Sequence, residues 1–203
     1  MKLIGMLDSP YVRRVAISAK RLGITLDHES VSVFRHFEQF RQINPVVKAP
    51  TLVLDDGEVL MDSTLIIDYL QALAAPGRSL MPAGIEQRLH ALRLIGLALA
   101  ACEKSVQLYY ERNLRPADIQ YHPWVERVEG QLAAAYAALE RELDKQPLNT
   151  DGSIDQAGIT LAVAWSFTNL VVPDQVDDAQ FPRIAAFTAY AEGLEAFVST
   201  PLE

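Results

Sequence analysis

The stretch Leu3-Ile4-Gly5-Met6-Leu7-Asp8-Ser9-Pro10-Tyr11-Val12 decides how the first half of this 203-residue chain is interpreted. Residues 3–7 form a short apolar run, as expected for a strand that is buried on both faces. Ser9 and Pro10 then stand where a helix favours its N-cap and its first residue. Apolar residues follow at helical spacing as far as Gly23, so the pattern predicts a strand that leads directly into a helix.

A second strand and a hairpin complete the pattern of the N-terminal third. Residues 26–33 have the composition of a strand, which predicts a strand–helix–strand unit with parallel strands. Residues 51–54 and 59–61 flank an Asp-Gly turn and predict a hairpin, after which Asp62 opens another helix. We therefore predict an α/β domain over residues 1–75 in the order βαβαββα, in which the helix within the irregular segment 34–44 has the weakest signal.

The rest of the chain has a helical pattern only. Residues 76–83 contain proline, glycine and serine, and are predicted to be a linker. Beyond them apolar residues recur every three or four positions, and a last helix is predicted over residues 182–198. Residues 159–172 are apolar nearly all round, which predicts a central buried helix. We therefore predict an all-α helical bundle over residues 84–203.

Composition excludes several classes of protein. Eighteen Lys and Arg against 26 Asp and Glu give a net charge of −8, which argues against a nucleic-acid-binding surface. The single cysteine, Cys102, allows no intrachain disulfide and fits a reducing compartment. The four histidines show no paired metal-ligand spacing, so no metal is expected. Because no apolar run suits a membrane span or a signal peptide, we expect a cytoplasmic protein.

Three short motifs lie at the ends of elements in the first half: Ser9-Pro10-Tyr11-Val12, Val47-Lys48-Ala49-Pro50-Thr51-Leu52 and Asp62-Ser63. In this order, and ahead of a helical half, they resemble the glutathione S-transferase superfamily in its bacterial, Ser-type form. The resemblance covers essentially the whole chain. It implies a thioredoxin-like, glutathione-binding domain followed by a helical domain.

Ser9 is the catalytic residue that the resemblance implies. A serine at this position ordinarily caps its helix, and that interpretation stays open. In the family, the residue here acts on the sulfur of glutathione, whose thiol, with a pKa of about 8.5, is only ~3% ionised at pH 7. A hydroxyl donor and the positive end of the helix both favour the thiolate. The absence of Cys-x-x-Cys excludes disulfide exchange through an enzyme thiol at this site.

The other two motifs are implied to hold glutathione, the co-substrate. The resemblance implies a cis Ala49–Pro50 bond, which presents the backbone of Ala49 to the cysteinyl part of the tripeptide. Lys48 is expected to meet a carboxylate of the tripeptide, although a solvated surface lysine explains it nearly as well. The Ser63 hydroxyl and its helix start suit the γ-glutamyl carboxylate, and Asp62 suits the α-amino group. An ordinary N-cap explains the same pair.

The pocket for the electrophile is less well defined by the sequence. Aromatic residues at helical spacing belong more often to a core than to a pocket. Two neighbouring arginines, Arg13 and Arg14, are expected to be solvated or to pair with acids. The residues expected to line the pocket are Tyr11, Phe34, Tyr109, Tyr110, Arg112 and Trp165, with Arg115 beside them.

Two positions depart from the family's pattern. Val47 stands two residues before Ala49, where the family often has glycine. The family also commonly caps its buried helix with Ser/Thr-x-x-Asp. Thr160-Leu161-Ala162-Val163 is interpreted as this cap without its acid, which would cost about 1 kcal/mol of stability.

The resemblance implies an enzyme that promotes attack of the glutathione thiolate on small electrophiles. Two alternatives remain: a non-catalytic member that binds glutathione or a protein partner, and a glutathione-dependent isomerase or dehalogenase. The motifs do not separate them, because a binding module would keep the same residues around the tripeptide. The expected partners are glutathione, a small electrophile and a second copy of the chain in a homodimer, but no nucleic acid and no membrane.

Overall fold

The computed structural model describes residues 1–202, and the chain divides into two compact units. The sheet unit comprises residues 1–80 together with the chain from Leu194 onward, and the helical unit comprises residues 81–193. This division differs from the expected one, which placed the boundary at residue 75 and everything after residue 83 in a helical domain. The sequence pattern identifies the last residues as helical, but it does not reveal which unit they pack on.

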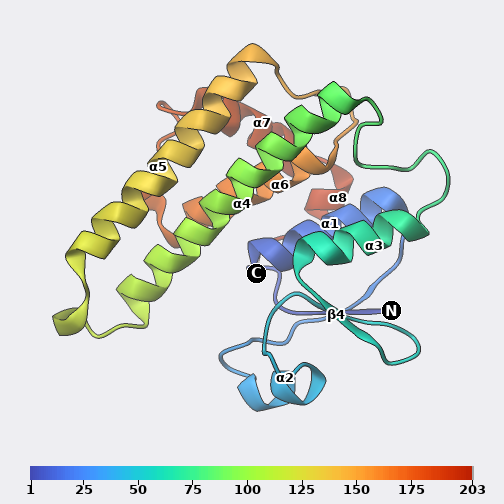
Figure 1. Ribbon diagram of the computed structural model, residues 1–203, viewed down its shortest axis with the longest axis horizontal. Coiled ribbons are helices and arrows are strands. Elements are labelled where there is room, and N and C mark those ends of the chain that lie inside the picture. Colours follow the sequence, from blue (N-terminus) through green and yellow to red (C-terminus); the bar gives the residue numbers. More distant parts are fainter. Residues whose placement is uncertain (203) are drawn as a thin grey trace. The chain divides into compact units, whose positions relative to one another are not determined.

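The sheet unit has the predicted order βαβαββα, which is thereby confirmed (Figure 1). β1 (Lys2–Ile4) pairs in parallel with β2 (Asp27–Glu29) and antiparallel with β3 (Thr51–Val53). β3 also pairs antiparallel with β4 (Val59–Met61), which gives the strand order β2-β1-β3-β4. The loop from β3 to β4 contains the predicted Asp-Gly turn, and Gly57 adopts a φ of 90° there.

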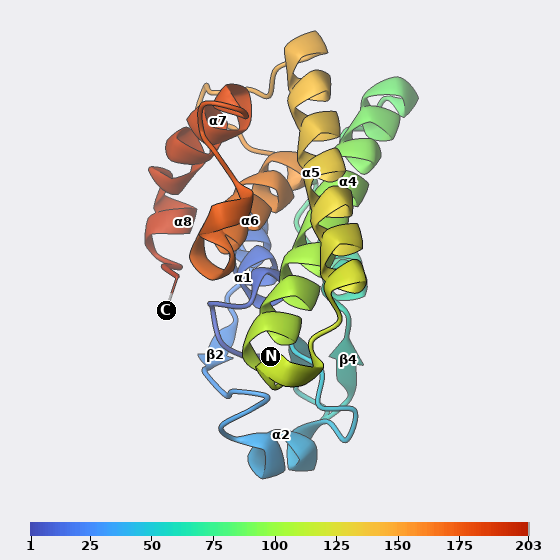
Figure 2. The same cartoon turned by 90° about the vertical axis from the view of Figure 1, so that its left-hand side faces the viewer.

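Helices cover both faces of this small sheet. α1 (Pro10–Leu22) and α3 (Ser63–Leu73) pack together on one face, and α2 (Phe37–Ile43) lies on the other (Figures 1 and 2). The face toward α2 is closed by an apolar cluster that includes Phe40 and Ile4. The three motifs of the sequence lie in the β1–α1 turn and in the segments before β3 and α3. Each of these segments therefore connects buried elements.

The predicted last helix is two helices. α7 (Pro182–Glu192) ends at Gly193, and α8 (Glu195–Val198) begins two residues later. α8 packs beside α1, so the break at Gly193 is where the chain leaves the helical unit and returns to the sheet unit. The apolar periodicity across residues 182–198 continues through the break, which is why the pattern alone predicts one helix.

The helical unit consists of long, closely packed helices. α4 (Ile85–Asn113) and α5 (His122–Lys145) lie side by side (Figure 2), joined through the 3₁₀ turn η1 (Ala117–Ile119). α6 (Gln156–Val171) packs against α4 and α7 and is buried along most of its length, as predicted for the central helix. A second 3₁₀ turn, η2 (Pro173–Gln175), follows α6. Within the described chain, no helix combines the length and the apolar character that crossing a membrane requires.

The cap of α6 lies five residues earlier than predicted. Asp155 occupies the N-cap, and its Oδ1 accepts a hydrogen bond of 2.8 Å from the backbone N–H of Gly158. Thr160 lies inside the helix and donates to a backbone carbonyl one turn back, so it is not the cap. With Asp155 as the cap, the acid of the motif would stand three residues later, at Gly158. A side chain does not fit there, because a Cβ on Gly158 would lie 2.9 Å from side-chain atoms of both Ile154 and Phe187.

Three buried hydroxyl groups join α4, α5 and α6. The Thr168 Oγ1 lies 2.7 Å from the Ser105 Oγ and 2.6 Å from the Tyr136 Oη. The Tyr136 hydroxyl also lies 3.1 Å from the carbonyl of Ala164, to which it donates. Burial raises the pKa of Tyr136 far above its usual range, so the network stays neutral. Each hydroxyl therefore has a partner in a core that excludes water.

Candidate functional site

Ser9 occupies the N-cap position of α1 but does not cap the helix. Its backbone is extended, with φ −69° and ψ 123°, as an N-cap requires, yet its side chain makes no capping hydrogen bond. Within residues 1–202 the Ser9 hydroxyl has no hydrogen-bond partner. Pro10 follows at the first helical position, where its missing N–H costs nothing. An uncommitted hydroxyl at the positive end of a 13-residue helix is chemically suited to an anion.

The Ala49–Pro50 peptide bond is cis, which confirms the prediction. Within residues 1–202, the backbone N–H and C=O of Ala49 form no hydrogen bond. The segment also approaches the β1–α1 turn closely, because a Cβ on Gly5 would lie 3.1 Å from the Ala49 Cβ. This approach brings the second motif next to the turn that carries Ser9. The sheet unit thus places unpaired backbone groups of Ala49 next to Gly5, in the turn that leads to Ser9.

Val47 has a backbone conformation that favours glycine. Its φ is 52°, in the left-handed region that β-branched residues rarely adopt. Such a residue costs about 1–3 kcal/mol and persists where the surrounding structure holds it. Here the Val47 side chain packs on the apolar cluster around Phe40, which holds the segment before Ala49 in place.

Asp62 and Lys48 lie together at the start of α3. Asp62 is the N-cap of α3, and its Oδ1 accepts a hydrogen bond of 2.9 Å from the backbone N–H of Thr64. Its second carboxylate oxygen lies 3.8 Å from the Lys48 Nζ, with both side chains about half exposed. Asp62 also has a φ of 74°, which is unusual for a residue other than glycine. The structure therefore joins two of the predicted glutathione-binding residues through an ion pair.

Ser63 is buried at the first position of α3 and is held by an arginine from α1. The Arg14 Nη1 donates to the Ser63 Oγ at 2.9 Å and to the Thr64 Oγ1 at 3.1 Å. Both Arg14 and Arg13 are only 1% exposed, so the expectation that they are solvated is wrong. Arginine is rarely buried, and its hydroxyl partners lie 49 and 50 residues away, so no local signal marks it.

The arrangement around Ser63 has a chemical consequence. A serine hydroxyl can accept hydrogen bonds through its lone pairs and donate one through its proton. Because Arg14 donates to the Ser63 Oγ, the proton of Ser63 remains available to a further acceptor such as a carboxylate. Arg14 is therefore the residue of this region that sequence reasoning missed.

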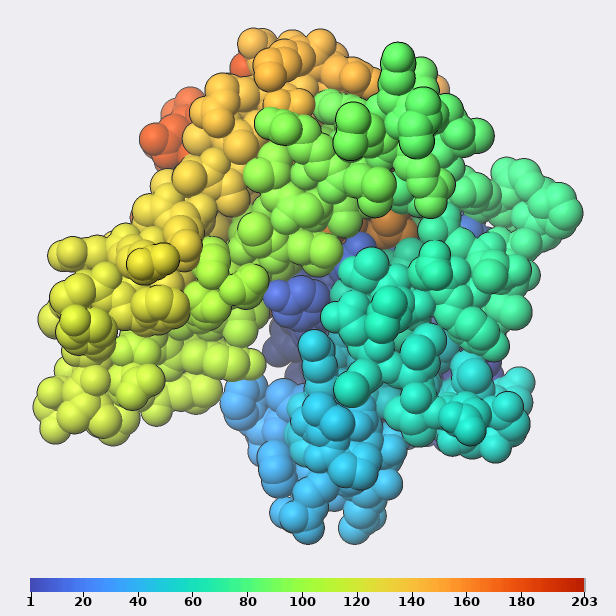
Figure 3. Space-filling model, in the orientation of Figure 1, coloured from blue at the N-terminus to red at the C-terminus, as the bar shows by residue number. Residues whose placement is uncertain are grey.

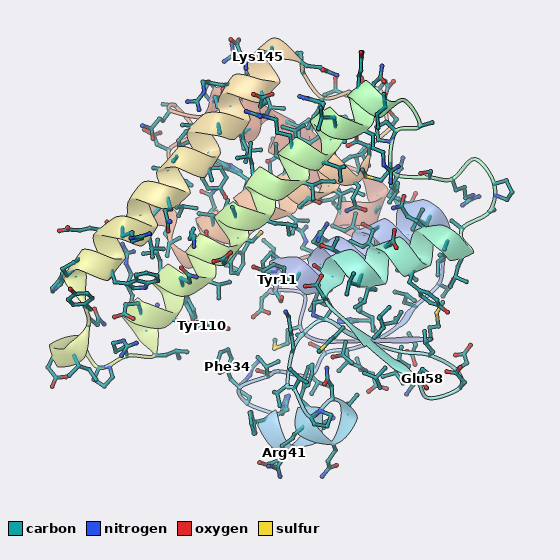
Figure 4. The ribbon with its side chains drawn as sticks, viewed as in Figure 1. Tyr11, Phe34, Arg41, Glu58, Tyr110 and Lys145 are labelled. Atoms are coloured by element: carbon teal, nitrogen blue, oxygen red, sulfur yellow. The ribbon has the colours of Figure 1, made fainter. Side chains whose placement is uncertain are left out.

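Two of the residues expected to meet the electrophile belong to the sheet unit. Tyr11 lies in the first turn of α1, and Phe34 lies on the connection that precedes α2 (Figure 4). The Phe34 side chain is 54% exposed, which is high for a phenylalanine. Its exposure favours a contact surface over a core role.

The helical unit contains a pocket of about 420 Å³ at the junction of α4 and α5. Tyr110, near the end of α4 (Figure 4), lines this pocket together with Arg115. Tyr109 and Arg112 are not among its lining residues; Arg112 instead forms ion pairs of 2.7 Å with Glu129 and 2.9 Å with Asp174. The full lining is Gln107, Tyr110, Glu111, Leu114, Arg115, Pro116, Ile119 and Trp124.

Trp165 lies in the core of the helical unit. Its side chain is only 4% exposed and packs edge-on against Tyr136, with ring centroids 5.0 Å apart. Phe181 contacts the same ring at 5.8 Å. This burial favours a packing role over the pocket-lining role expected for Trp165. Among residues 1–202, no three or more His, Cys, Asp or Glu side chains form a group that could hold a metal ion.

A four-stranded sheet in the order βαβαββα, with a cis-proline before β3 and an N-cap serine on α1, defines a thioredoxin-like protein with an appended helical unit. Comparison with known proteins agrees, because residues 3–78 match the family model of the glutathione S-transferase N-terminal domain. The chain is also 28% identical over 170 residues to the uncharacterized GST-like protein YibF of Escherichia coli (strain K12), covering 83% of this chain and 82% of that protein.

Solved structures extend the similarity over the whole chain. A glutathione transferase family member from Pseudomonas fluorescens Pf-5, with bound glutathione, matches with a TM-score of 0.87 and 28% identity, covering 100% of this chain and 98% of that one. A structure of a family member from the same strain with bound S-(propanoic acid)-glutathione has a TM-score of 0.82 and 28% identity, covering 98% of each chain. Residues 3–78 thus match the glutathione S-transferase N-terminal domain family, and over its whole length the chain is similar to solved structures of glutathione transferase family members.

Proposed function

We propose that this protein is a glutathione transferase in which Ser9 stabilises the thiolate of bound glutathione. The observation that carries the proposal is the Ser9 hydroxyl, which stands at the start of α1 without a partner among residues 1–202. A hydroxyl that capped the helix would be committed to a backbone N–H. An uncommitted one donates to the sulfur anion, and the positive end of α1 adds to the stabilisation.

The remaining motifs hold the tripeptide in this proposal. The backbone of Ala49, beside Pro50, pairs with the cysteinyl residue of glutathione as a one-residue strand addition. Ser63, oriented by Arg14, donates its proton to the γ-glutamyl carboxylate. Asp62 and Lys48, which form an ion pair in this structure, receive the α-amino group and a carboxylate respectively.

The chemical step is nucleophilic attack by the thiolate on an electrophilic carbon. The sulfur forms a new C–S bond. Either a leaving group departs with the bonding electrons, or the π electrons of a double bond move to the neighbouring atoms, which then take a proton from water. The relative that binds S-(propanoic acid)-glutathione supports this class of product, because its ligand carries an organic acid on the glutathione sulfur. Tyr11 and Phe34 of the sheet unit are the residues proposed to contact the electrophile.

Ser9→Ala tests the proposal against the binding-only alternative. We expect turnover of an activated aryl halide to fall about 10²–10³-fold, as when one donor to a reacting anion is removed, with the Kd of glutathione nearly unchanged. Ser79→Ala, on the connection after α3, is the matched control and should leave turnover unchanged. Unchanged turnover in Ser9→Ala would contradict the thiolate role. A wild-type protein that binds glutathione but turns over none of a broad electrophile panel would favour the binding module.

The exposed surface of α4 supports a homodimer. Ile85, Leu89 and Leu92 repeat at i, i+4 and i+7 on one face, and each is more than half exposed. Figure 3 shows this first part of α4 (bright green) uncovered on the side in view. Leu89→Glu is expected to shift the sedimentation coefficient toward a monomer, whereas Leu170→Glu, at an exposed leucine of α6, should not. A wild-type monomer at high concentration would contradict the proposal.

The proposed location is the cytoplasm. The chain has one cysteine, Cys102, which is buried, and a glutathione-dependent protein of this composition suits a reducing compartment.

A further inference from the structure

The C-terminal segment of the sheet unit, from Leu194 onward, contacts a buried arginine of α1. Arg13 is 1% exposed, and its Nε donates to the carbonyl of Thr200 at 2.9 Å. Its guanidinium carbon also lies 5.5 Å from the centre of the Phe197 ring, within the range of a cation–π contact. Two independent groups of the C-terminal segment therefore hold the Arg13 side chain.

A second attachment lies at the other end of the helix. The Lys20 Nζ donates to the carbonyl of Ser199 at 2.7 Å and contacts its hydroxyl at the same distance. Lys20 follows Arg13 by seven residues, which is about two turns, so both side chains project from one face of α1. The two attachments differ in environment: Arg13 is buried, whereas Lys20 is exposed.

Only the Arg13 attachment is coupled directly to Ser9. The backbone N–H of Arg13 donates to the carbonyl of Ser9 at 2.9 Å, which closes the first turn of α1. The terminal turns of helices fray, and the Ser9 side chain makes no capping bond that would oppose it. A side chain fixed at the fourth helical residue restrains this turn from outside the helix.

We propose that Arg13 is a positioning residue: held by Thr200 and Phe197, it fixes the first turn of α1 and thereby the hydroxyl of Ser9. The inference rests on the proposed function, since it assigns Arg13 a role in orienting the donor to the glutathione sulfur. It also gives the segment from Leu194 onward a part in the site, although its own residues need not touch glutathione.

Arg13→Met tests the proposal, with Lys20→Met as the matched control that removes the attachment remote from Ser9. The readout is the pKa of enzyme-bound glutathione, followed through the ultraviolet absorbance of its thiolate. We expect Arg13→Met to raise this pKa by about one unit, a tenfold loss of thiolate, and to lower kcat rather than raise KM. Lys20→Met should leave the pKa unchanged. A purely structural role would lower Tm without moving the thiol pKa, and that outcome would overturn the inference.

Phe197→Leu distinguishes the loss of a contact that holds the Arg13 side chain from the loss of its positive charge. It removes the ring beside the guanidinium and keeps Arg13 itself. It is expected to raise the thiol pKa in the same direction by a smaller amount, and it serves where Arg13→Met fails to fold. A shift in Arg13→Met without any shift in Phe197→Leu would overturn the anchoring role in favour of a direct charge effect. Failure of the proposed function is distinguishable, since the wild type would then show no lowered thiol pKa at all.

Discussion

The sheet unit and the helical unit differ in how their helix caps and selected hydroxyl groups are used. In the helical unit, Asp155 caps α6 and the hydroxyls of Ser105, Tyr136 and Thr168 bond to one another. In the sheet unit, the hydroxyl at the N-cap of α1 makes no capping bond, and the residues before β3 and α3 include two with positive φ. Departures from relaxed local structure thus gather around the three motifs. This is where a binding site is expected, because such departures persist where a function requires them.

Arg14→Met is expected to have the largest effect, and it tests whether the sheet unit depends on its buried cation for binding. The change removes the donor to Ser63 and Thr64 and leaves both hydroxyls free to turn. Hydrogen bonds to charged groups contribute about 1.5–3 kcal/mol, so the Kd of glutathione should rise roughly 10–100-fold. Titration calorimetry measures it.

Arg21→Met, at the end of the same helix, is the control for Arg14→Met. It removes an arginine from the last turn of α1, seven residues after Arg14, and the affinity for glutathione should change less than twofold. Equal losses in both variants would mean that α1 needs cationic charge in general rather than the bond to Ser63.

Thr168→Val probes the paired hydroxyl network of the helical unit. It deprives the buried hydroxyls of Ser105 and Tyr136 of their shared partner, and the free energy of unfolding should fall by about 1–3 kcal/mol. Glutathione affinity should stay unchanged. Urea denaturation measures the loss.

Thr188→Val makes the same chemical change at a buried hydroxyl of the helical unit that is not paired. The Thr188 Oγ1 is buried on α7 and has no hydrogen-bond partner among residues 1–202. Replacing it with a methyl group should leave stability unchanged or raise it. A loss as large as that of Thr168→Val would show that pairing does not account for the difference.

Asp155→Ala removes the cap of α6 and should cost about 1 kcal/mol of unfolding free energy. Asp178→Ala, at an exposed loop position, is the control and should be neutral. Thr160→Ala distinguishes the two positions considered for the cap, because it should cost less than Asp155→Ala. The reverse order would return the cap to Thr160.

Asp155 also predicts a pH dependence. Burial raises its pKa above the ordinary value of 3.8, so the folded protein holds this proton more tightly than the unfolded chain. The stability contributed by the protonated form is present below pH 3.8 and is lost as pH rises through the folded pKa. Asp155→Asn keeps a capping oxygen without titrating, so its stability relative to wild type should rise over that range. A difference that is flat with pH would contradict this.

Val47→Gly is expected to have the smallest effect. Relief of the positive φ, about 1–3 kcal/mol, is offset by the lost side-chain packing and by the entropy of glycine. The net change in unfolding free energy should lie within about 1 kcal/mol. Val46→Gly, next to it, gains no such relief and should cost about 0.5–1 kcal/mol. A much larger loss in Val47→Gly than in Val46→Gly would mean that packing, not backbone strain, dominates at this position.

Much of the sheet unit was predictable because its signals are local. The run of residues 3–7, the serine and proline that open α1, the glycine that ends it and the Asp-Gly turn each act within a few residues. The acid that caps α3 was predictable for the same reason. The cis Ala49–Pro50 bond followed only from the resemblance, since a trans bond is the ordinary expectation.

The missed features depend on contacts between distant residues. The burial of Arg14 is set by α3, and that of Arg13 by a segment 187 residues away. The sequence alone does not locate the cap of α6, because Thr160 and Asp155 are both good N-cap residues. Trp165 was expected in a pocket because an aromatic side chain at helical spacing gives no sign of which neighbours enclose it.

The discontinuous make-up of the sheet unit bears on how the protein is synthesised. Residues 1–80 leave the ribosome first, but their last partner is the segment from Leu194 onward, which emerges only after the entire helical unit. Until then, Arg13 lacks its contacts with Thr200 and Phe197. The nascent chain therefore passes through a stage in which its helical unit can fold before the first turn of α1 gains these contacts. A fusion partner joined after this segment would disturb the proposed glutathione site before it disturbed the helical unit.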